Sequence, residues 1–316
     1  MAASRARVRR PGTATGMVDA VAAPRVSRPA EPEPAPKPEP VVRGQHGRLI
    51  VRAERIAGRT RLVDVRQRPP LQVLRATHPD AALPDLAAIT IVSPAGGVLQ
   101  GDVLEMEIRV AAGARLSVGT QSATRVYRAP NVGAVMSTTL HVEPAAYLEY
   151  MPDPIVPYDG SRLGATTSCV VADSSTLILG EAVTGGRLAR GERFGLDRFE
   201  SLVEIRRPDG DLLARDTVML GGDAPPARLG RLGGHLAMGT LYVVHAGFEA
   251  LTLRESIDPS LGPGIAVGAS DLPDGAGAWL RVLAPDARSV LAVLRAAWAA
   301  ARLQILGVKP PIDRRP

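Results

Sequence analysis

Two glycine-rich stretches are the places in this sequence where phosphate chemistry would be expected. Residues 96–102 and 186–192 both carry the G-x-x-x-x-G spacing with which a P-loop cradles phosphates. A lysine should follow the second glycine, but Asp102 and Glu192 stand there instead. A carboxylate in that place repels the phosphates that lysine would attract. The sequence therefore argues against nucleotide hydrolysis by this chain, and we interpret the glycines as tight turns.

Metal-ligand spacing is also absent from the sequence. The five histidines are scattered, with no H-x-H or H-x-x-x-H pair, and one cysteine cannot complete a closed zinc site or an internal disulfide. Cys169 lies in a valine-rich run, where a small buried side chain is expected. His235 and His245 flank a glycine-bearing segment, and the sequence leaves open whether these two histidines approach each other in the fold.

Nucleophilic catalysis has no recognisable motif either. The chain contains no G-x-S-x-G elbow of the kind that exposes a catalytic serine. A pair of carboxylates that catalyses hydrolysis stays open as an alternative, because such a pair meets only in three dimensions. The sequence thus predicts a protein that is not an enzyme, with a carboxylate-pair hydrolase as the rival hypothesis.

The formal charge of +6 does not indicate a nucleic-acid-binding face. Residues 1–45 hold eight Arg or Lys against four Asp or Glu, and residues 308–316 hold three against one. The two ends therefore carry the whole excess, and the body between them is neutral. A binding face for nucleic acid needs basic residues clustered on the folded domain. We expect no nucleic-acid partner.

Membrane and export signals are weak. The apolar run Met17–Ala23 is short and interrupted by an acid, and no uncharged run of about 18 apolar residues appears. A single cysteine fits a reducing compartment. We expect a cytoplasmic protein that does not cross a membrane.

Short runs with β-type alternation dominate the sequence from Leu49 onward. In Val103–Val110 every second residue is apolar, which predicts a half-buried strand, and we expect it to be antiparallel. Leu49–Ile56 and Thr60–Arg66 predict a hairpin, and a Pro-Asp-Gly turn predicts another between Phe199–Arg206 and Leu212–Thr217. No internal repeat is recognisable. Further predicted strands are Leu71–Thr77, Ala88–Ser93, Ala114–Thr120, Ala134–Val142, Ala146–Met151, Thr167–Ala172 and Thr176–Glu181.

One helix is expected, at Pro285–Leu306, with Asp286 as its N-cap and Gly307 as its C-cap. Three arginines recur every seven residues, and we expect them to form a solvated edge or to meet an acidic partner. The predicted apolar stripe is Leu291, Leu294, Trp298, Ala301 and Ile305, and the arginines are Arg288, Arg295 and Arg302.

These elements predict a mainly β protein, either a many-stranded sandwich-like fold or a large folded-over sheet, with a C-terminal helix and few others. Proline occupies every second position from 32 to 40, which favours extended chain over packed structure. We therefore expect a disordered tail over residues 1–45, a single β domain over residues 46–307 and a flexible tail over residues 308–316.

Four unusual segments lie between the predicted strands and place carboxylate, hydroxyl or amide groups near strand ends. Without reference to any family, they suggest one polar surface or channel built from loops. The segments are Ser93–Asp102, Thr120–Arg128, Leu148–Tyr158 and Gly180–Arg187.

With these segments, the chain resembles the UreD (UreH) family of urease accessory proteins from about Gly47 to Gly307. The matching patterns are S-P-x-G-G…G-D, T-Q-x-A-T-R-V-Y-R, L-E-Y-x-P-D-P and G-E-x-V-T-x-G-R-L-A-R-G-E, in the order of the family. Gln100 is a departure, because glycine is common at its place. The resemblance implies a scaffold that works with UreF and the GTPase UreG, binds apo-urease and assists nickel insertion.

The resemblance leads to a hypothesis about which residues nickel meets. Weak oxygen ligands release nickel, whereas thiolate or histidine cages trap it, so no cofactor should be stably bound. We expect Asp102, Asp153 and Glu181 to line a route, although Asp102 and Glu181 could simply accept hydrogen bonds from turn amides. A passive ligand-binding module remains a further alternative. We expect Thr120, Gln121 and Thr124 to help shape the route, and together with Arg128 they form the predicted polar loop surface.

Overall fold

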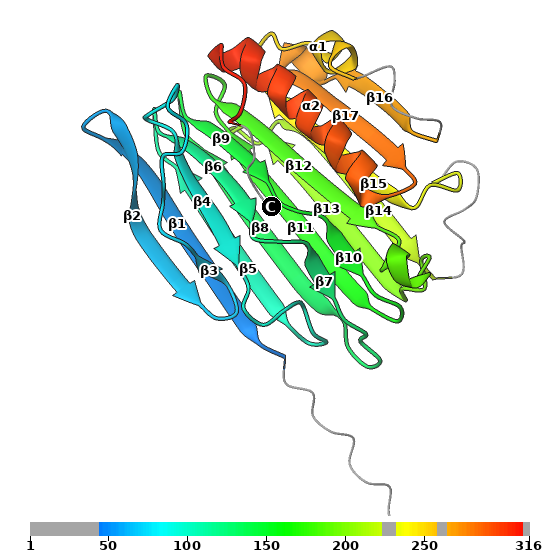
Figure 1. Cartoon of the computed structure of the whole chain (residues 1–316). Coiled ribbons are helices and arrows are strands. Elements are labelled where there is room, and N and C mark those ends of the chain that lie inside the picture. Colours follow the sequence, from blue (N-terminus) through cyan, green and yellow to red (C-terminus); the bar gives the residue numbers. More distant parts are fainter. Residues whose placement is uncertain (1–43, 223–231, 258–263, 312–316) are drawn as a thin grey trace, which may run out of the picture. The chain divides into compact units, whose positions relative to one another are not determined.

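The computed structural model describes residues 44–222, 232–257 and 264–311, which form two stacked β-sheets with two α-helices on the outside of one of them (Figure 1). Sheet A has the strand order β14-β13-β11-β8-β5-β1-β2. Its strands are β1 (His46–Ile56), β2 (Arg59–Arg68), β5 (Val103–Val110), β8 (Ala134–Val142), β11 (Arg162–Val171), β13 (Arg198–Arg206) and β14 (Leu212–Gly221).

Sheet B has the order β16-β17-β15-β12-β9-β6-β4-β3, with β10 paired to β12 and β7 paired to β10. Its strands are β3 (Gln72–Val73), β4 (Ala87–Val92), β6 (Arg115–Thr120), β7 (Thr124–Val126), β9 (Tyr147–Met151), β10 (Ile155–Pro157), β12 (Thr176–Thr184), β15 (Ala237–Val244), β16 (Ala266–Asp271) and β17 (Gly277–Ala284). The mainly β prediction is confirmed. The sandwich-like arrangement also agrees with it.

The middle of the sandwich is a coil of parallel strands joined by repeated arches. Each arch carries the chain from a strand of sheet A to a strand of sheet B, over residues 110–115, 142–147 and 171–176. The same turn hydrogen bond closes every arch, so the backbone repeats although no sequence repeat is recognisable. These bonds are Ala114 N to Ala111 O (2.9 Å), Ala146 N to Glu143 O (3.0 Å) and Ser175 N to Ala172 O (3.0 Å).

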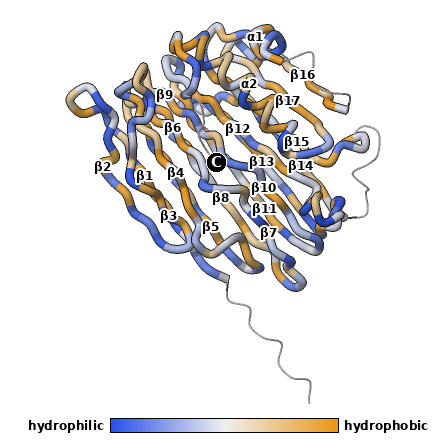
Figure 2. Tube along the Cα trace, viewed as in Figure 1, coloured by the Kyte–Doolittle hydropathy of each residue, from blue (hydrophilic) through white to orange (hydrophobic). Residues whose placement is uncertain are grey.

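The prediction that Val103–Val110 is antiparallel is wrong, although its bounds are confirmed as β5. This strand pairs in parallel with both β1 and β8. Alternation reports that one face is buried, and it carries no information on the direction of the neighbouring strands. Figure 2 shows the alternation as changes of colour along the strands.

Two apolar cores follow from this arrangement. The larger core lies between the sheets and includes Phe199 and Ile205 of β13. The smaller core lies between sheet B and the helices α1 (Ala250–Glu255) and α2 (Ala287–Leu306). Gly239 of β15 permits close packing of α2, because a Cβ atom there would lie 2.5 Å from a methyl group of Val290.

Helix α2 has the predicted caps. The Asp286 side chain accepts a hydrogen bond from Ser289 N (2.8 Å), and Gly307 ends the helix with φ of 71°. The buried face is Val290, Val293, Leu294, Ala297, Ala301 and Arg302, so Leu294 and Ala301 of the predicted stripe are buried, while Leu291, Trp298 and Ile305 are half-buried.

The predicted solvated arginine edge on α2 is wrong for Arg302. Arg288 and Arg295 are exposed, but Arg302 has only 1% of its surface accessible and forms an ion pair with Asp80. Spacing by seven places these residues on one side of a helix, but Arg302 meets the buried carboxylates of Asp80 and Glu149.

Length and composition alone would allow α2 to cross a membrane. In the structure its apolar face packs on sheet B, and an ionised arginine lies within that interface. We therefore interpret α2 as a core helix of the β domain.

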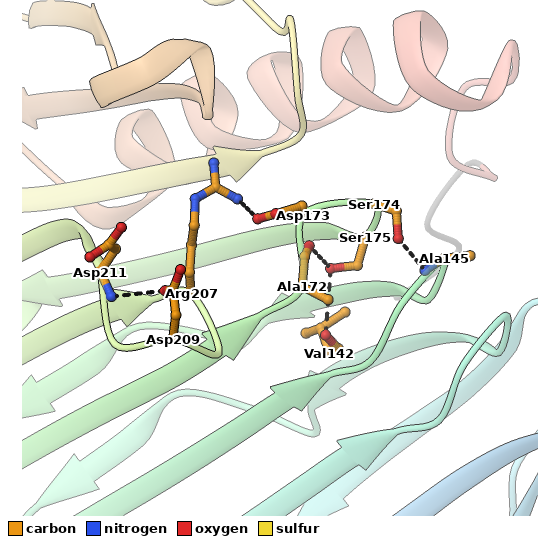
Figure 3. Close-up of polar contacts among 9 residues, drawn as sticks. All are labelled: Val142, Ala145, Ala172, Asp173, Ser174, Ser175, Arg207, Asp209 and Asp211. Atoms are coloured by element: carbon orange, nitrogen blue, oxygen red, sulfur yellow. Dashed lines mark hydrogen bonds and ion pairs between the residues drawn. The ribbon is translucent and has the colours of Figure 1, made fainter.

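Polar contacts tie together the connections at one end of the strands (Figure 3). The predicted turn after β13 closes through Arg207 N and Asp211 O (2.9 Å), and the Arg207 side chain forms an ion pair with Asp173 of the last arch. Ser174 accepts a hydrogen bond from Ala145 N (3.1 Å) of the arch before it. The hairpin is thereby fastened to the coil.

The predicted tails lie largely outside the described residues. Gly44 and Gln45, placed in the tail by the sequence, already contact the β5 entry, because Gln45 N donates to the Asp102 carboxylate (2.7 Å). At the other end, Val308 packs against the smaller core. Residues 1–43 and 312–316 are not described.

Candidate functional site

A cavity of about 180 Å³ lies between the two sheets. Strands β5, β8, β11, β13 and β14 line it from sheet A, and β4, β6, β9, β12 and β15 line it from sheet B. Gln121, Ser122 and Arg125 also belong to the lining and are exposed, so the cavity opens at the loop after β6.

A row of polar side chains crosses the otherwise apolar interior. In sheet B, Glu181, Thr240 and Arg281 are register neighbours across β12, β15 and β17. In sheet A, Thr167 and Asp216 lie in one row across β11, β13 and β14. The two rows meet, because the Thr167 hydroxyl donates to Glu181 Oε1 (3.0 Å) and Arg281 forms an ion pair with Asp216. We call these five residues the polar belt.

The Glu181 carboxyl is the most perturbed acid of the belt. Burial raises its pKa to about 7, and the negative charge of Asp216 acts in the same direction. Hydrogen bonds from Thr167 and Ser201 and the positive charge of Arg281 oppose this rise in pKa. Near neutral pH the group therefore exchanges its proton readily, and a cation that binds there displaces that proton.

Asp216 is held from two sides. Its Oδ2 accepts a hydrogen bond from Tyr242 OH (2.7 Å) and takes part in the ion pair with Arg281. Burial and the charge of Asp216 raise the pKa of the Tyr242 phenol, so Tyr242 stays a donor. The Arg281 guanidinium also reaches Thr240 Oγ1 (3.2 Å). The polar belt thus contains two acidic side chains, Glu181 and Asp216, and one basic side chain, Arg281.

Five of the residues predicted from the sequence line this one cavity. Asp153 and Thr120 lie near its opening, where Asp153 N donates to Thr120 Oγ1 (2.8 Å) and the Thr120 hydroxyl donates to Asp153 Oδ2 (3.1 Å). Gln121 of the loop after β6, Thr124 of β7 and Glu181 of β12 line the same cavity. The structure therefore brings Asp153 and Glu181 into one cavity.

Asp102 and Arg128 are not among the residues that line the cavity. The buried Asp102 carboxylate accepts hydrogen bonds from Gln45 N (2.7 Å) and Leu99 N (2.9 Å), which is the turn-amide role that the sequence left open. Arg128 is exposed and forms a β-bridge with Ser161.

Asp216 was missed by sequence reasoning. Ala214, Val218 and Leu220 pack against the larger core, and Asp216 has the same parity on β14. A charged residue at an inward position of a strand is the signal that could have identified it. Arg281 of β17 was missed as well. The same signal applies to it, because Trp279 and Leu283 on its side of the strand pack against that core.

Within the described ranges, no three His, Cys, Asp or Glu side chains are arranged to hold a metal ion. His235 and His245 lie beyond opposite ends of β15, so the approach left open by the sequence does not occur. Cys169 is buried, as expected, and burial raises the pKa of its thiol. The described residues that line the cavity include no His or Cys, and their carboxylates are those of Asp153, Glu181 and Asp216.

Comparison with known proteins identifies the family. The family model described as UreD urease accessory protein matches residues 45–316. A urease accessory protein UreD 2 of Streptomyces griseus is 34% identical over 82% of this chain and 90% of its own length. UreD of Haloarcula marismortui is 35% identical over 86% and 91%, and UreD 2 of Brucella suis is 34% identical over 87% and 94%. The chain therefore belongs to the UreD family of urease accessory proteins.

Proposed function

We propose that this protein acts in urease maturation as a non-catalytic scaffold that conducts nickel through its inter-sheet cavity. It works in the cytoplasm in a complex with UreF and the GTPase UreG, and this complex binds apo-urease. Nickel is cargo, held in transit and never stably bound. The observation that carries this proposal is the cavity between the sheets lined by Asp153, Glu181 and Asp216, in a member of the urease accessory family.

The donor set fits an ion in transit. Nickel binds strongly to nitrogen and sulfur donors, which would slow its release. Glu181 offers one carboxylate for which protons compete with the ion near neutral pH, and the hydroxyl of Thr167 lies next to it. Asp153 at the opening would meet the ion first. Asp102 is left out of the route, because turn amides occupy its oxygens.

The absence of a lysine in the glycine-rich turns fits a division of labour in which UreG hydrolyses GTP. Glu192, in the place of a P-loop lysine, accepts a hydrogen bond from Arg187 N (2.8 Å) and forms an ion pair with the Arg187 side chain. Both glycine-rich turns are thus stabilised by their carboxylates.

Activation of urease by the Glu181→Gln variant is the test. The variant removes the titratable oxygen but keeps the size of the side chain. Glu107→Gln is the matched control, because Glu107 lies on the outer face of β5 with 40% of its side chain exposed. Apo-urease is activated with the accessory proteins, and its nickel content is measured together with co-purification of UreF.

Loss of nickel in urease with Glu181→Gln, while Glu107→Gln activates normally and both variants bind UreF, is the expected result. Equal activation by both variants would remove Glu181 from the route. A carboxylate-pair hydrolase remains the rival, since Glu181 and Asp216 line the same cavity. The purified chain is expected to hydrolyse neither urea nor GTP, and turnover of either would favour the rival.

A further inference from the structure

A second cavity, of about 270 Å³, lies beside the first between β14 and β17. Asp216 belongs to the lining of both cavities. Exposed Asp271 belongs to the second lining, so this space, which we call the edge cavity, reaches solvent at the edge of the sheets. Other residues that line it are Ala214, Tyr242, Trp279 and Arg281.

Asp216 forms part of the wall of both cavities. It is joined to Arg281 by an ion pair and to Tyr242 by a hydrogen bond of 2.7 Å. Thr240, which lines the first cavity, is contacted by Arg281 from the other side at 3.2 Å. The guanidinium of Arg281 therefore closes the wall by holding both neighbours.

The Arg281 side chain has an alternative position over the Trp279 ring. Its guanidinium carbon already lies 5.6 Å from the centre of the Trp279 ring, within the range of a cation–π contact. Trp279 lines the edge cavity and not the first cavity. A shift of Arg281 toward Trp279 would uncover Asp216 on the side of the first cavity.

A divalent cation in the first cavity favours that shift. The ion carries twice the charge of the guanidinium, repels it, and competes with it for the carboxylate of Asp216. Glu181 lines the same cavity as Asp216, lies opposite Thr240 in sheet B, and supplies a second carboxylate. Two carboxylates and the hydroxyls of Thr167 and Thr240 form an oxygen-donor set for such an ion.

We infer that the Asp216–Arg281 ion pair is a gate that a divalent cation opens. With no ion bound, Arg281 closes the wall between the cavities. An ion held by Glu181 and Asp216 drives Arg281 over Trp279, and the first cavity then joins the edge cavity. The identification of the ion as nickel rests on the proposed function.

The two tryptophans of the chain make the gate observable. A Trp298→Phe background leaves Trp279 as the sole tryptophan, and Zn²⁺ serves as a divalent probe without unpaired electrons to quench fluorescence. The full chain in this background is titrated with Zn²⁺ while its emission is recorded. We expect a saturable shift of the Trp279 emission, because the guanidinium moves over the ring.

Arg281→Met is the key variant, because it keeps the apolar stem and removes the charge. We expect it to abolish the emission shift and to tighten Zn²⁺ binding in equilibrium dialysis about tenfold, since Asp216 is no longer neutralised. The double variant Asp216→Asn/Arg281→Met removes both charges, which guards against misfolding from an unpaired acid. It should show no shift and weaker Zn²⁺ binding than the parent.

An emission shift that survives Arg281→Met, or no shift in the parent at saturating Zn²⁺, would overturn the gate. The urease activation test distinguishes this from failure of the proposed function. If Glu181→Gln blocks nickel delivery but the Trp279 emission never responds, the route stands and the gate is wrong. If Glu181→Gln delivers nickel normally, Glu181 is not on the route, whatever Trp279 shows.

Discussion

Arg302 near the end of α2 pairs with Asp80 in the connection before β4, a partner 222 positions earlier in the chain. The same guanidinium lies 3.5 Å from Glu149 of β9, which accepts a hydrogen bond from Tyr147 OH (2.5 Å). Arg302 and Glu149 are almost fully buried. The last helix is therefore fixed to the early part of the fold by charge as well as by apolar packing.

Removal of Arg302 should destabilise the fold strongly. Arg302→Met leaves Asp80 and Glu149 buried without their cation, which typically costs about 3–5 kcal/mol. Arg288→Met on an exposed position of the same helix is the control and should change stability by less than about 0.5 kcal/mol. Urea unfolding of both variants measures the difference. Equal stabilities would mean that the buried pair contributes little.

Gly239 should tolerate no side chain. In Gly239→Ala the new methyl group would lie 2.5 Å from Val290 and 2.9 Å from Leu294, so α2 must move away from β15. We expect a loss of about 1–3 kcal/mol from this overpacking. Gly268→Ala on β16 is a matched strand glycine with no atom within 4 Å of the added carbon. Thermal unfolding should separate the two variants clearly; a similar melting temperature would contradict the close packing.

Glu181 should make stability depend on pH. Its pKa is about 7 in the folded protein, against 4.5 for an unperturbed glutamate side chain, so the folded state binds the proton more tightly than the unfolded chain does. Stability that is present below pH 4.5 is then lost as the pH rises through about 7. The difference between the folded and unfolded pKa of Glu181 corresponds to about 3 kcal/mol in the free energy of unfolding.

Glu181→Gln cannot titrate, so it removes this contribution. Unfolding free energies of the parent and the variant, measured in urea between pH 4.5 and 8, should diverge as the pH rises, with the parent losing stability relative to the variant. Parallel curves would show that the carboxyl titrates normally in the folded state.

Cys169 should be inert in the native protein. It lies within the larger core, and burial raises the pKa of its thiol, so little thiolate forms and reagents cannot reach it. An aromatic disulfide reagent should label it only after unfolding. Ser174→Cys places a control thiol on an exposed arch position, and that thiol should react at once. Fast labelling of Cys169 in the parent would reveal opening of the core.

Local features of the fold were predictable from the sequence. The bounds of β5 and β8 and the two caps of α2 are confirmed, because alternation and capping are set by neighbouring residues. Strand direction was not predictable, since it depends on which segments pair. The eight residues of β15 are all buried, so no alternation marks that strand. Of the predicted strand Leu71–Thr77, only Gln72–Val73 is regular.

The site was predictable only in part, for the same reason. Asp153 and Glu181 stand in recognisable segments, and the structure places both on the cavity. Asp216 and Arg281 lie in ordinary-looking strands and meet across 65 positions of sequence. Their role depends on register between sheets, which a single sequence does not reveal.

The order of strands in both sheets follows the order of synthesis. The strands of sheet A from β1 to β14 lie side by side in their order along the chain, and so do those of sheet B from β3 to β17. The exceptions are the outer strands β2 and β16. A nascent chain can therefore lay most new strands beside the preceding strand of the same sheet, and each sheet keeps an open growing edge until its last strands are added. Exposed edges recruit other chains. Vulnerability to misassembly should thus be concentrated in the interval before β14 and β17 leave the ribosome.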